Sequence, residues 1–141
     1  MDLRRWEDTS RGPRSSSSTG PPRNTLYWTE DRPDSFALKM TSAADAREGD
    51  LIAFGHTHKP WYRELEGIHL LNTGSVGKPK DGDWRAGYAL VEAAEEVTGI
   101  EFVRVEYDVE RAAEGILRSE LPDEFAGQLR AGGSPRPVEV V

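Results

Sequence analysis

The sequence predicts a mixed α/β fold in which β-strands follow one another along the chain instead of alternating with helices. Two short apolar runs, 51–54 and 68–71, each lead into a polar segment that contains glycine, as buried strands do. Further along, 87–92 and 100–107 have the pattern of strands, and 93–99 joins them as a hairpin. Four consecutive strands favour a layered sheet arrangement over a doubly wound one.

Helices are expected before and after this group of strands in the chain. Asp34 or Ser35 is expected to cap a helix that runs to about Ala46, with its apolar side chains mostly on one side. The stretch 109–118 has helical periodicity interrupted by one glycine. After a proline break, 123–130 is expected to form a second, shorter helix.

Composition divides the chain into three parts. Residues 1–23 contain four consecutive serines and almost no apolar side chain, so they cannot bury a face and are expected to be disordered. The ordered domain spans 24–121 and begins with Tyr27 and Trp28, which are expected to anchor the core. Residues 122–141 hold the last short helix and a frayed tail with glycines and prolines.

The composition also narrows the class of protein. The 141 residues include no cysteine, so a metal would have to take histidine, carboxylate, amide or carbonyl ligands, which suits Mn, Fe, Zn or Mg. The net charge of −7 argues against nonspecific binding to nucleic acid. No run approaches the ~20 apolar residues of a membrane span, and the polar N-terminus lacks the pattern of a signal peptide. A cytoplasmic protein with no membrane partner is therefore expected.

Two histidines, His56 and His58, follow the 51–54 strand directly. A glycine-rich loop that contains Gly74 follows the 68–71 strand in the same way. If the two strands are neighbours, their ends form one wall of a metal and phosphate site. The His-x-His pattern alone is weak evidence for a metal, because half-buried histidines are common and stable zinc sites take three or four protein ligands. Metal binding and a structural role both remain open on this evidence.

Basic side chains flank these histidines, where an anionic substrate would dock, although each one alone is explained equally well as a solvated surface charge. They are Lys59, Arg63, Lys78, Lys80 and Arg85. Arg85 is the preferred phosphate contact because a guanidinium binds phosphate at two points. Turn formation explains Asp81 and Asp83 better than metal binding does. His69 alternates away from the core and is expected at the surface or at a sheet edge.

Three motifs occur together in one half of the chain: GHTHKP at 55–60, NTGSVGKP at 72–79 and GDWRAGY at 82–88. In combination they resemble the calcineurin-like metallophosphoesterases, in particular their small bacterial and archaeal phosphodiesterase branch. The stretch YWTEDRP at 27–33 is similar to the segment that these proteins carry upstream of GHTH. The resemblance extends from about Thr25 to about Leu117. It implies the C-terminal half of a four-layer αββα sandwich.

This resemblance implies a hydrolase, either a phosphodiesterase or a phosphatase, in which two divalent metals activate a water that attacks phosphorus. His56 would bind one metal and His58 the other, with manganese as the expected ion and iron, zinc or nickel as alternatives. Phosphate contact or support of the site is implied for three loop residues and one arginine, Asn72, Gly74, Ser75 and Arg85. The implied partner is a small phosphate ester or a nucleotide.

The chain departs from the family's pattern upstream of these motifs. The family's Asp-x-His, Gly-Asp-x-x-Asp and Gly-Asn-His motifs do not occur, and histidine is present only at positions 56, 58 and 69. A further family histidine falls where this chain has TGPP, at 19–22. The resemblance therefore implies a half-built site that needs other ligands.

Three interpretations follow from this departure. The chain is an enzyme that becomes active when a partner chain or another segment supplies the missing ligands, or it is an inactive pseudoenzyme half that acts as a binding module through an exposed sheet edge. In the third interpretation it is a truncated or frameshifted gene fragment whose residues 1–23 are out-of-frame sequence. Reading all frames of the upstream DNA tests the third.

Overall fold

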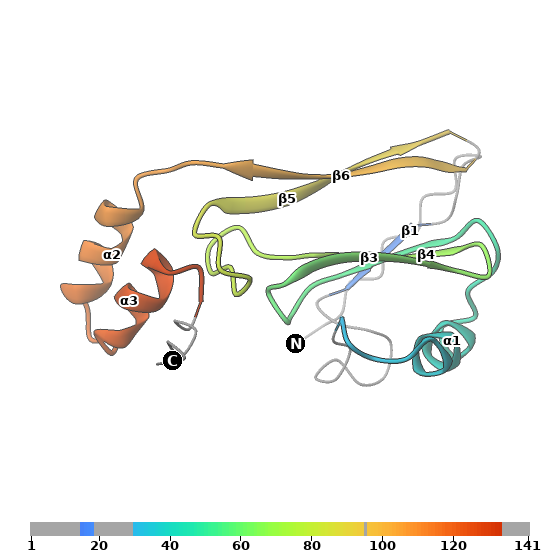
Figure 1. Ribbon diagram of the computed structural model, residues 1–141, viewed down its shortest axis with the longest axis horizontal. Helices are drawn as coiled ribbons and strands as arrows, with labels where there is room; N and C mark the ends of the chain where they lie inside the picture. Colours follow the sequence, from blue (N-terminus) through green and yellow to red (C-terminus); the bar gives the residue numbers. More distant parts are fainter. Residues whose placement is uncertain (1–14, 19–29, 95, 134–141) are drawn as a thin grey trace, which may run out of the picture.

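The arrangement of strands and helices was obtained from a computed structural model, which describes residues 15–18, 30–94 and 96–133. Figure 1 shows its elements in chain order. They are β1 (Ser15–Ser18), α1 (Asp34–Ala43), β2 (Leu51–Phe54), β3 (Pro60–Leu65), β4 (Ile68–Thr73), β5 (Ala86–Ala93), β6 (Val97–Val105), α2 (Val109–Leu117) and α3 (Glu124–Arg130). Among the described residues, no helix is long and apolar enough to cross a membrane.

The central layer is a four-stranded sheet with the strand order β1-β2-β4-β3. Strands β2 and β4 are parallel neighbours, and Phe54 lies opposite Asn72 at their ends. This arrangement confirms that the 51–54 and 68–71 runs form adjacent strands. Because parallel strands end at the same edge of a sheet, the segments that follow β2 and β4 lie next to each other.

Strand β3 is an element that the sequence analysis does not predict. It pairs antiparallel with β4, and the two strands are joined by Glu66 and Gly67, with φ angles of 51° and 71°. Two consecutive residues with positive φ form the type of turn that matches the twist of a two-residue hairpin. From Trp61 to Leu65 the side chains alternate between half-buried and exposed, as in a strand with one covered face.

The expectation of disorder over 1–23 is wrong for Ser15–Ser18, whose backbone forms β1 and pairs in parallel with β2. The edge of β2 offers backbone donors and acceptors to any segment that lies beside it, whatever its side chains, so a serine run can complete the sheet. The rest of 1–23, the pair Tyr27 and Trp28, and the tail beyond residue 133 lie outside the described residues.

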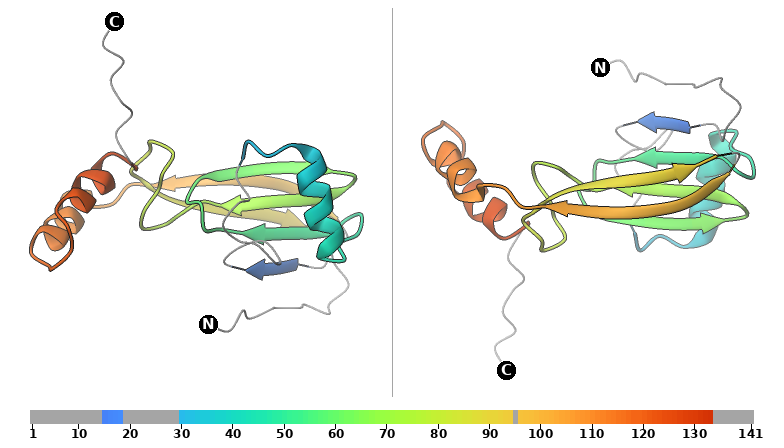
Figure 2. Two further views of the ribbon diagram at one scale, coloured as in Figure 1. Left: turned by 90° about the horizontal axis from the view of Figure 1, so that it is seen from below. Right: turned by 90° about the horizontal axis from the view of Figure 1, so that it is seen from above.

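Helix α1 covers one face of the sheet, and Figure 2 shows it crossing the strands. Ala37 of this helix packs with Ile52, Phe54 and Leu70 in the main buried cluster. The predicted start is shifted, because Pro33 occupies the N-cap position and no side-chain cap bond forms. The helix ends three residues before the expected 46, since Asp45 takes a φ of 59°, which the helix cannot accommodate.

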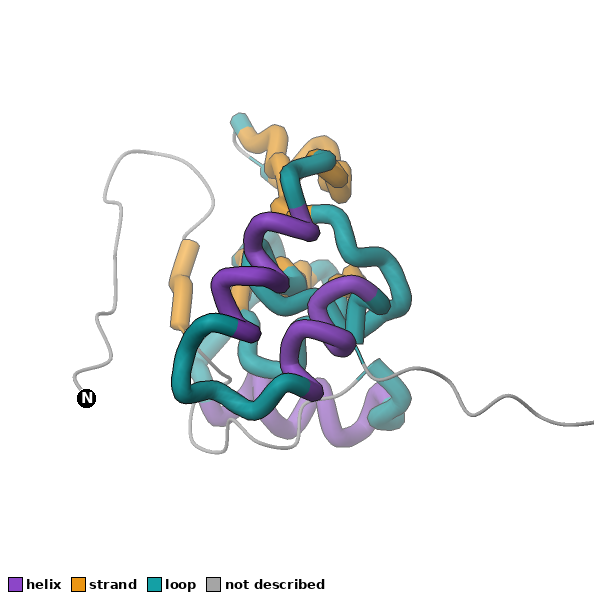
Figure 3. Tube along the Cα trace, turned by 90° about the vertical axis from the view of Figure 1, so that its left-hand side faces the viewer, coloured by secondary structure: helices purple, strands orange, loops and turns teal. Residues whose placement is uncertain are grey.

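The hairpin of β5 and β6 lies over the other face of the sheet (Figure 1), which confirms the strands predicted near 87–92 and 100–107. Helices α2 and α3 pack side by side at one end of the molecule (Figure 3) and are linked by an ion pair between Arg130 and Glu110. Asp108 caps α2 by accepting a bond from the Arg111 amide at 2.9 Å. The segment 78–85 runs between the sheet, the hairpin and α3.

Candidate metal centre

Both predicted metal ligands lie in the turn that follows β2, and both have a left-handed backbone. The φ angles are 84° at His56 and 62° at His58, whereas Gly55 does not have a positive φ. A positive φ is unfavourable for residues with a Cβ, and such residues are concentrated at functional sites whose surroundings hold them in place. His56 is exposed and His58 is half-buried. The chain therefore turns sharply at the end of β2, and the two histidines themselves adopt the left-handed conformation.

The side chain of His58 has a defined hydrogen-bond partner. Its Nδ1 lies 2.7 Å from the carbonyl oxygen of Lys78. A carbonyl only accepts hydrogen bonds, so Nδ1 carries the proton and Nε2 of the neutral ring keeps a free lone pair. Metal-binding histidines are commonly oriented by the same type of bond. The backbone of His58 is held too, because its carbonyl accepts a bond from the Lys80 amide at 3.1 Å.

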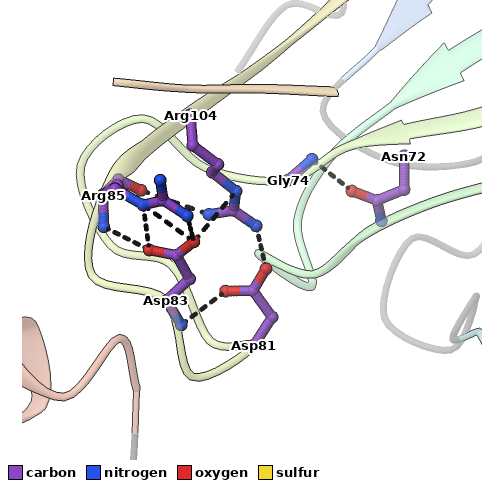
Figure 4. Close-up of polar contacts among 6 residues, drawn as sticks. All are labelled: Asn72, Gly74, Asp81, Asp83, Arg85 and Arg104. Atoms are coloured by element: carbon purple, nitrogen blue, oxygen red, sulfur yellow. Dashed lines mark hydrogen bonds and ion pairs between the residues drawn. The ribbon is translucent and has the colours of Figure 1, made fainter. Parts of the chain in front are cut away.

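Asn72 joins the turn after β2 to the loop after β4. It is fully buried, with none of its surface exposed. Its Nδ2 donates to Thr57 Oγ1 at 2.9 Å and to the Gly55 carbonyl at 3.4 Å. Its Oδ1 accepts from the Gly74 amide at 3.0 Å, as Figure 4 shows. All three contacts lie within the protein, so the amide group holds two loops together beside the histidines.

The loop after β4 uses its polar groups internally. The Gly74 amide is bound to Asn72, and a Cβ at Gly74, where φ is 75°, would lie 3.2 Å from the ring of Pro60. The hydroxyl of Ser75 accepts from the Lys78 amide at 2.9 Å, and its carbonyl accepts from the Gly87 amide at 3.1 Å. In this arrangement, Gly74 and Ser75 stabilise the loop that carries the Lys78 carbonyl to His58.

Four charged side chains meet behind this loop: Asp81, Asp83, Arg85 and Arg104 (Figure 4). Arg85 donates to both oxygens of Asp83, with Nη2 at 2.6 Å from Oδ2. These bonds hold the pKa of the Asp83 carboxyl at about 2, below its usual value of 3.8. Arg85, predicted as a phosphate contact, thus has its guanidinium engaged by a carboxylate. The carboxylates also form turn bonds, including one from the Arg85 amide to Asp83 at 3.0 Å.

The lowered pKa of Asp83 has a consequence for stability in acid. Because the folded protein depresses this pKa, Asp83 contributes its full stabilisation above about pH 4, and the contribution disappears as the pH falls towards about 2. We expect Asp83→Asn to lower the free energy of unfolding by roughly 1 kcal/mol near neutral pH, since the ion pair is partly exposed. Urea unfolding of both proteins across this range measures the difference, which should shrink in acid. A difference that stays constant would contradict the assignment.

Most of the flanking basic side chains have partners in the described structure. Lys59 pairs with Glu30 at 2.7 Å, and Arg63 Nη2 donates to the Glu30 carbonyl at 2.8 Å. The ammonium of Lys78 lies 4.2 Å from the centre of the Phe125 ring. With Arg85 bound to Asp83, these contacts reduce the free positive charge that the sequence placed around the motif. Lys80 is exposed.

His69 is separate from the other two histidines. It lies on β4, which is an interior strand of the sheet, so the expectation of an edge position is wrong. The side chain is half-buried and reaches the surface only in part. Its ring stacks on Tyr62 with 6.0 Å between the ring centres, and its Nδ1 lies 2.8 Å from the Tyr62 hydroxyl. This pair explains His69 without a metal.

Two features of the site could not be found from the sequence motifs. The Lys78 carbonyl is a backbone group 20 residues away from His58, and no residue type marks it. Arg104 lies in an alternating strand pattern that indicates only β-structure.

Within the described residues, no group of three or more His, Cys, Asp and Glu side chains is placed to hold a metal ion. The Nε2 of His58 is free to act as an imidazole ligand, which is the type of donor that divalent metals accept.

Comparison with known proteins identifies the family. Residues 19–96 match the calcineurin-like phosphoesterase superfamily domain. An uncharacterized protein of Methanocaldococcus jannaschii is 38% identical over 99 residues, which are 60% of this chain and 40% of that protein. A crystal structure of a metallophosphoesterase from Sphaerobacter thermophilus has a TM-score of 0.67 at 28% identity, covering 84% of this chain and 54% of that one.

A hypothetical protein from Pyrococcus horikoshii shares the fold, with a TM-score of 0.71 at 23% identity over 87% of this chain and 48% of that one. The chain thus spans about half the length of these relatives or less. The mixed α/β architecture agrees with the one implied by the motifs. Since the matched domain covers more than half of the 141 residues, the chain belongs to the calcineurin-like phosphoesterase superfamily.

Proposed function

We propose that His56 and His58 supply two of the ligands of a divalent-metal centre that hydrolyses phosphate esters. Membership of the phosphoesterase superfamily supports the reaction class. The single observation that carries the metal role is the bond from His58 Nδ1 to the Lys78 carbonyl, which leaves Nε2 unprotonated in the neutral ring. The left-handed backbone at both histidines supports the same role, because residues held in such unfavourable conformations are concentrated at functional sites.

A bound divalent metal supplies positive charge that polarises a phosphate ester and activates water. This chain's own contribution is to orient the histidines. Asn72 joins the loops on either side of them, and the Lys78 carbonyl sets the ring orientation of His58. Manganese is the proposed ion, and a small phosphate ester or a nucleotide is the proposed substrate.

The remaining ligands are proposed to come from outside the described residues, either from another segment or from a partner chain. Two imidazoles are fewer than the three or four protein ligands of a stable zinc site. The nearby carboxylates do not complete the set, because Asp81 pairs with Arg104 and Asp83 with Arg85. The chain alone is therefore expected to bind metal weakly and to hydrolyse esters slowly.

Calorimetric titration of the whole chain with Mn²⁺ tests the proposal. We expect one weak site, with an affinity at least about tenfold lower in the double variant His56→Ala/His58→Ala, because both proposed ligands are lost. His69→Ala is the matched control, since that histidine pairs with Tyr62 away from the turn. Equal affinities in the wild type and the double variant would overturn the metal role. Hydrolysis of bis(4-nitrophenyl) phosphate and 4-nitrophenyl phosphate, measured in parallel, distinguishes diesterase from monoesterase activity.

A binding module without hydrolysis is the second candidate, and the surface of the hairpin favours it. Five large apolar side chains of β5 and β6 are exposed, namely Tyr88, Leu90, Val91, Phe102 and Val105, and the strand register places Tyr88, Leu90 and Val105 on one face of the hairpin. Apolar side chains gathered on one element are typical of interaction surfaces. Ester hydrolysis by the wild type that is lost in the double variant would exclude this alternative.

A further inference from the structure

The segment 78–85, called the 78–85 loop below, contacts the histidine turn, strand β6 of the hairpin and the turn after α3. In Figure 1 it is the yellow-green segment between the central sheet and helices α2 and α3. Towards the sheet it provides the Lys78 carbonyl and the Lys80 amide to His58, at 2.7 and 3.1 Å. One bond orients the imidazole and the other holds the backbone of a residue with a φ of 62°. The geometry of His58 therefore depends on where this loop lies.

Arg104 holds the loop from the side of the hairpin. Its side chain is 17% exposed and forms an ion pair with Asp81 and a longer one with Asp83, at 3.9 Å. It also donates to the Arg85 carbonyl at 3.3 Å (Figure 4). A half-buried guanidinium with several acceptors fixes both its own position and theirs, because its donors form a planar fork.

The backbone of the hairpin leaves room for this guanidinium. A Cβ placed on Gly87 would lie 3.2 Å from Nη1 of Arg104, so any larger side chain at this position would displace it. The Gly87 amide is in turn bound to the Ser75 carbonyl. The missing side chain at Gly87 on β5 thus leaves the space that the Arg104 guanidinium occupies beside the 78–85 loop.

The turn that follows helix α3 also holds the loop. The Gly132 carbonyl accepts a bond from the Gly82 amide at 3.0 Å, and a Cβ on Gly132 would lie 2.5 Å from the carbonyl carbon of Asp83. The two backbones therefore touch directly. This contact holds the backbone at Gly82, and the ion pairs of Arg104 hold the carboxylates on either side of it, Asp81 and Asp83.

We propose that Arg104 is a positioning residue for His58, acting through Asp81 and Asp83 on the loop whose Lys78 carbonyl binds the imidazole. The hydrogen bonds and ion pairs of Arg104 within the described residues go to Asp81, Asp83 and the Arg85 carbonyl, so its effect on His58 passes through the loop backbone. The role in metal binding rests on the function proposed above, whereas the effect on the imidazole itself does not. These two consequences can therefore be measured separately.

The test uses the whole chain and two variants, Arg104→Met and Asp81→Asn, which remove the two ends of the ion pair. Long-range ¹H–¹⁵N NMR at mildly alkaline pH reports which ring nitrogen of His58 carries the proton, and His58→Ala assigns the signal. We expect the Nδ1-protonated form to dominate in the wild type and a mixture of both forms in the variants. Mn²⁺ affinity is expected to fall by about tenfold, the lower end of the range for residues that orient metal ligands, because Arg104 acts through the loop and not on the imidazole directly.

Arg118→Met is the control, because it removes the same charge from an exposed ion pair with Glu114 on α2. It should change neither the NMR signal nor the affinity. Wild-type tautomer populations in folded Arg104→Met and Asp81→Asn would overturn the proposal. If Arg104→Met does not fold, Asp81→Asn decides alone, since this side chain lies in an exposed turn. A chain that binds no Mn²⁺ but shows the tautomer change would overturn the proposed function and support the positioning role.

Discussion

We expect Asn72→Ala to lower the free energy of unfolding by about 3 kcal/mol, because it removes a buried group with three hydrogen bonds. The cost has two parts. A cavity replaces a fully buried side chain, and the Gly74 amide and the Thr57 hydroxyl lose their partner inside the protein. Urea unfolding followed by circular dichroism measures the change.

The same substitution should also loosen the turn that carries the histidines. Asn72 is the side chain that joins Gly55 and Thr57 to Gly74, so its loss removes the bridge between the two loops. Thr41→Val is the matched control, since Thr41 is equally buried but donates only to the Leu38 carbonyl of its own helix. We expect the control to cost less than about 1 kcal/mol. A similar cost for both variants would mean that Asn72 is an ordinary core residue.

Leu70→Ala is expected to cost about 4 kcal/mol, within the range for fully buried leucines. Leu70 has no exposed surface and lies on β4, between β2 and β3. It belongs to the cluster that joins the sheet to α1, with Ile52 and Phe54 as neighbours. The surrounding strands are tied by their ladders and cannot collapse to fill the space, so most of the cavity should persist.

Urea unfolding of the wild type and Leu70→Ala measures this loss. A lower midpoint with an unchanged dependence of the unfolding free energy on urea would establish that the variant has lost stability and that the compactness of its unfolded state is unchanged. Leu90→Ala is the control, because Leu90 on β5 is 48% exposed and should cost less than about 1 kcal/mol. If both substitutions cost the same, the core would have to include the hairpin surface. A partner covering that surface would then have to be present in the sample.

The elements that were predicted correctly are those in which the pattern of apolar residues within the segment indicates which side chains are buried. The apolar runs at 51–54 and 68–71 became β2 and β4, since a continuous apolar run favours burial on both faces. The helical periodicity after residue 109 became α2 with its cap at Asp108. The pattern of hydrophobic residues suffices in such places, because burial of a strand or helix face depends on nearby side chains.

The elements that were missed depend on backbone pairing with distant segments. Ser15–Ser18 has no side-chain pattern for a strand and is ordered by the edge of β2. Strand β3 has a modest alternation and forms because β4 lies beside it and the Glu66–Gly67 turn brings it back. Nearly every residue has the same backbone donor and acceptor, so the residue types do not indicate which segments pair, and neither pairing could be inferred from them.

The sequence by itself determined the family, the two neighbouring strands and the pair of histidines at the end of one of them. Only the tertiary structure decided how these histidines are held: His58 by a backbone carbonyl of Lys78, the adjoining turn by buried Asn72, and the 78–85 loop by Arg104. The physical reason is the same in each case. These contacts join segments that are 15 to 23 residues apart in the chain. Their partners are backbone atoms or ordinary polar side chains. These groups come close to one another only after the sheet, the hairpin and α3 have packed together.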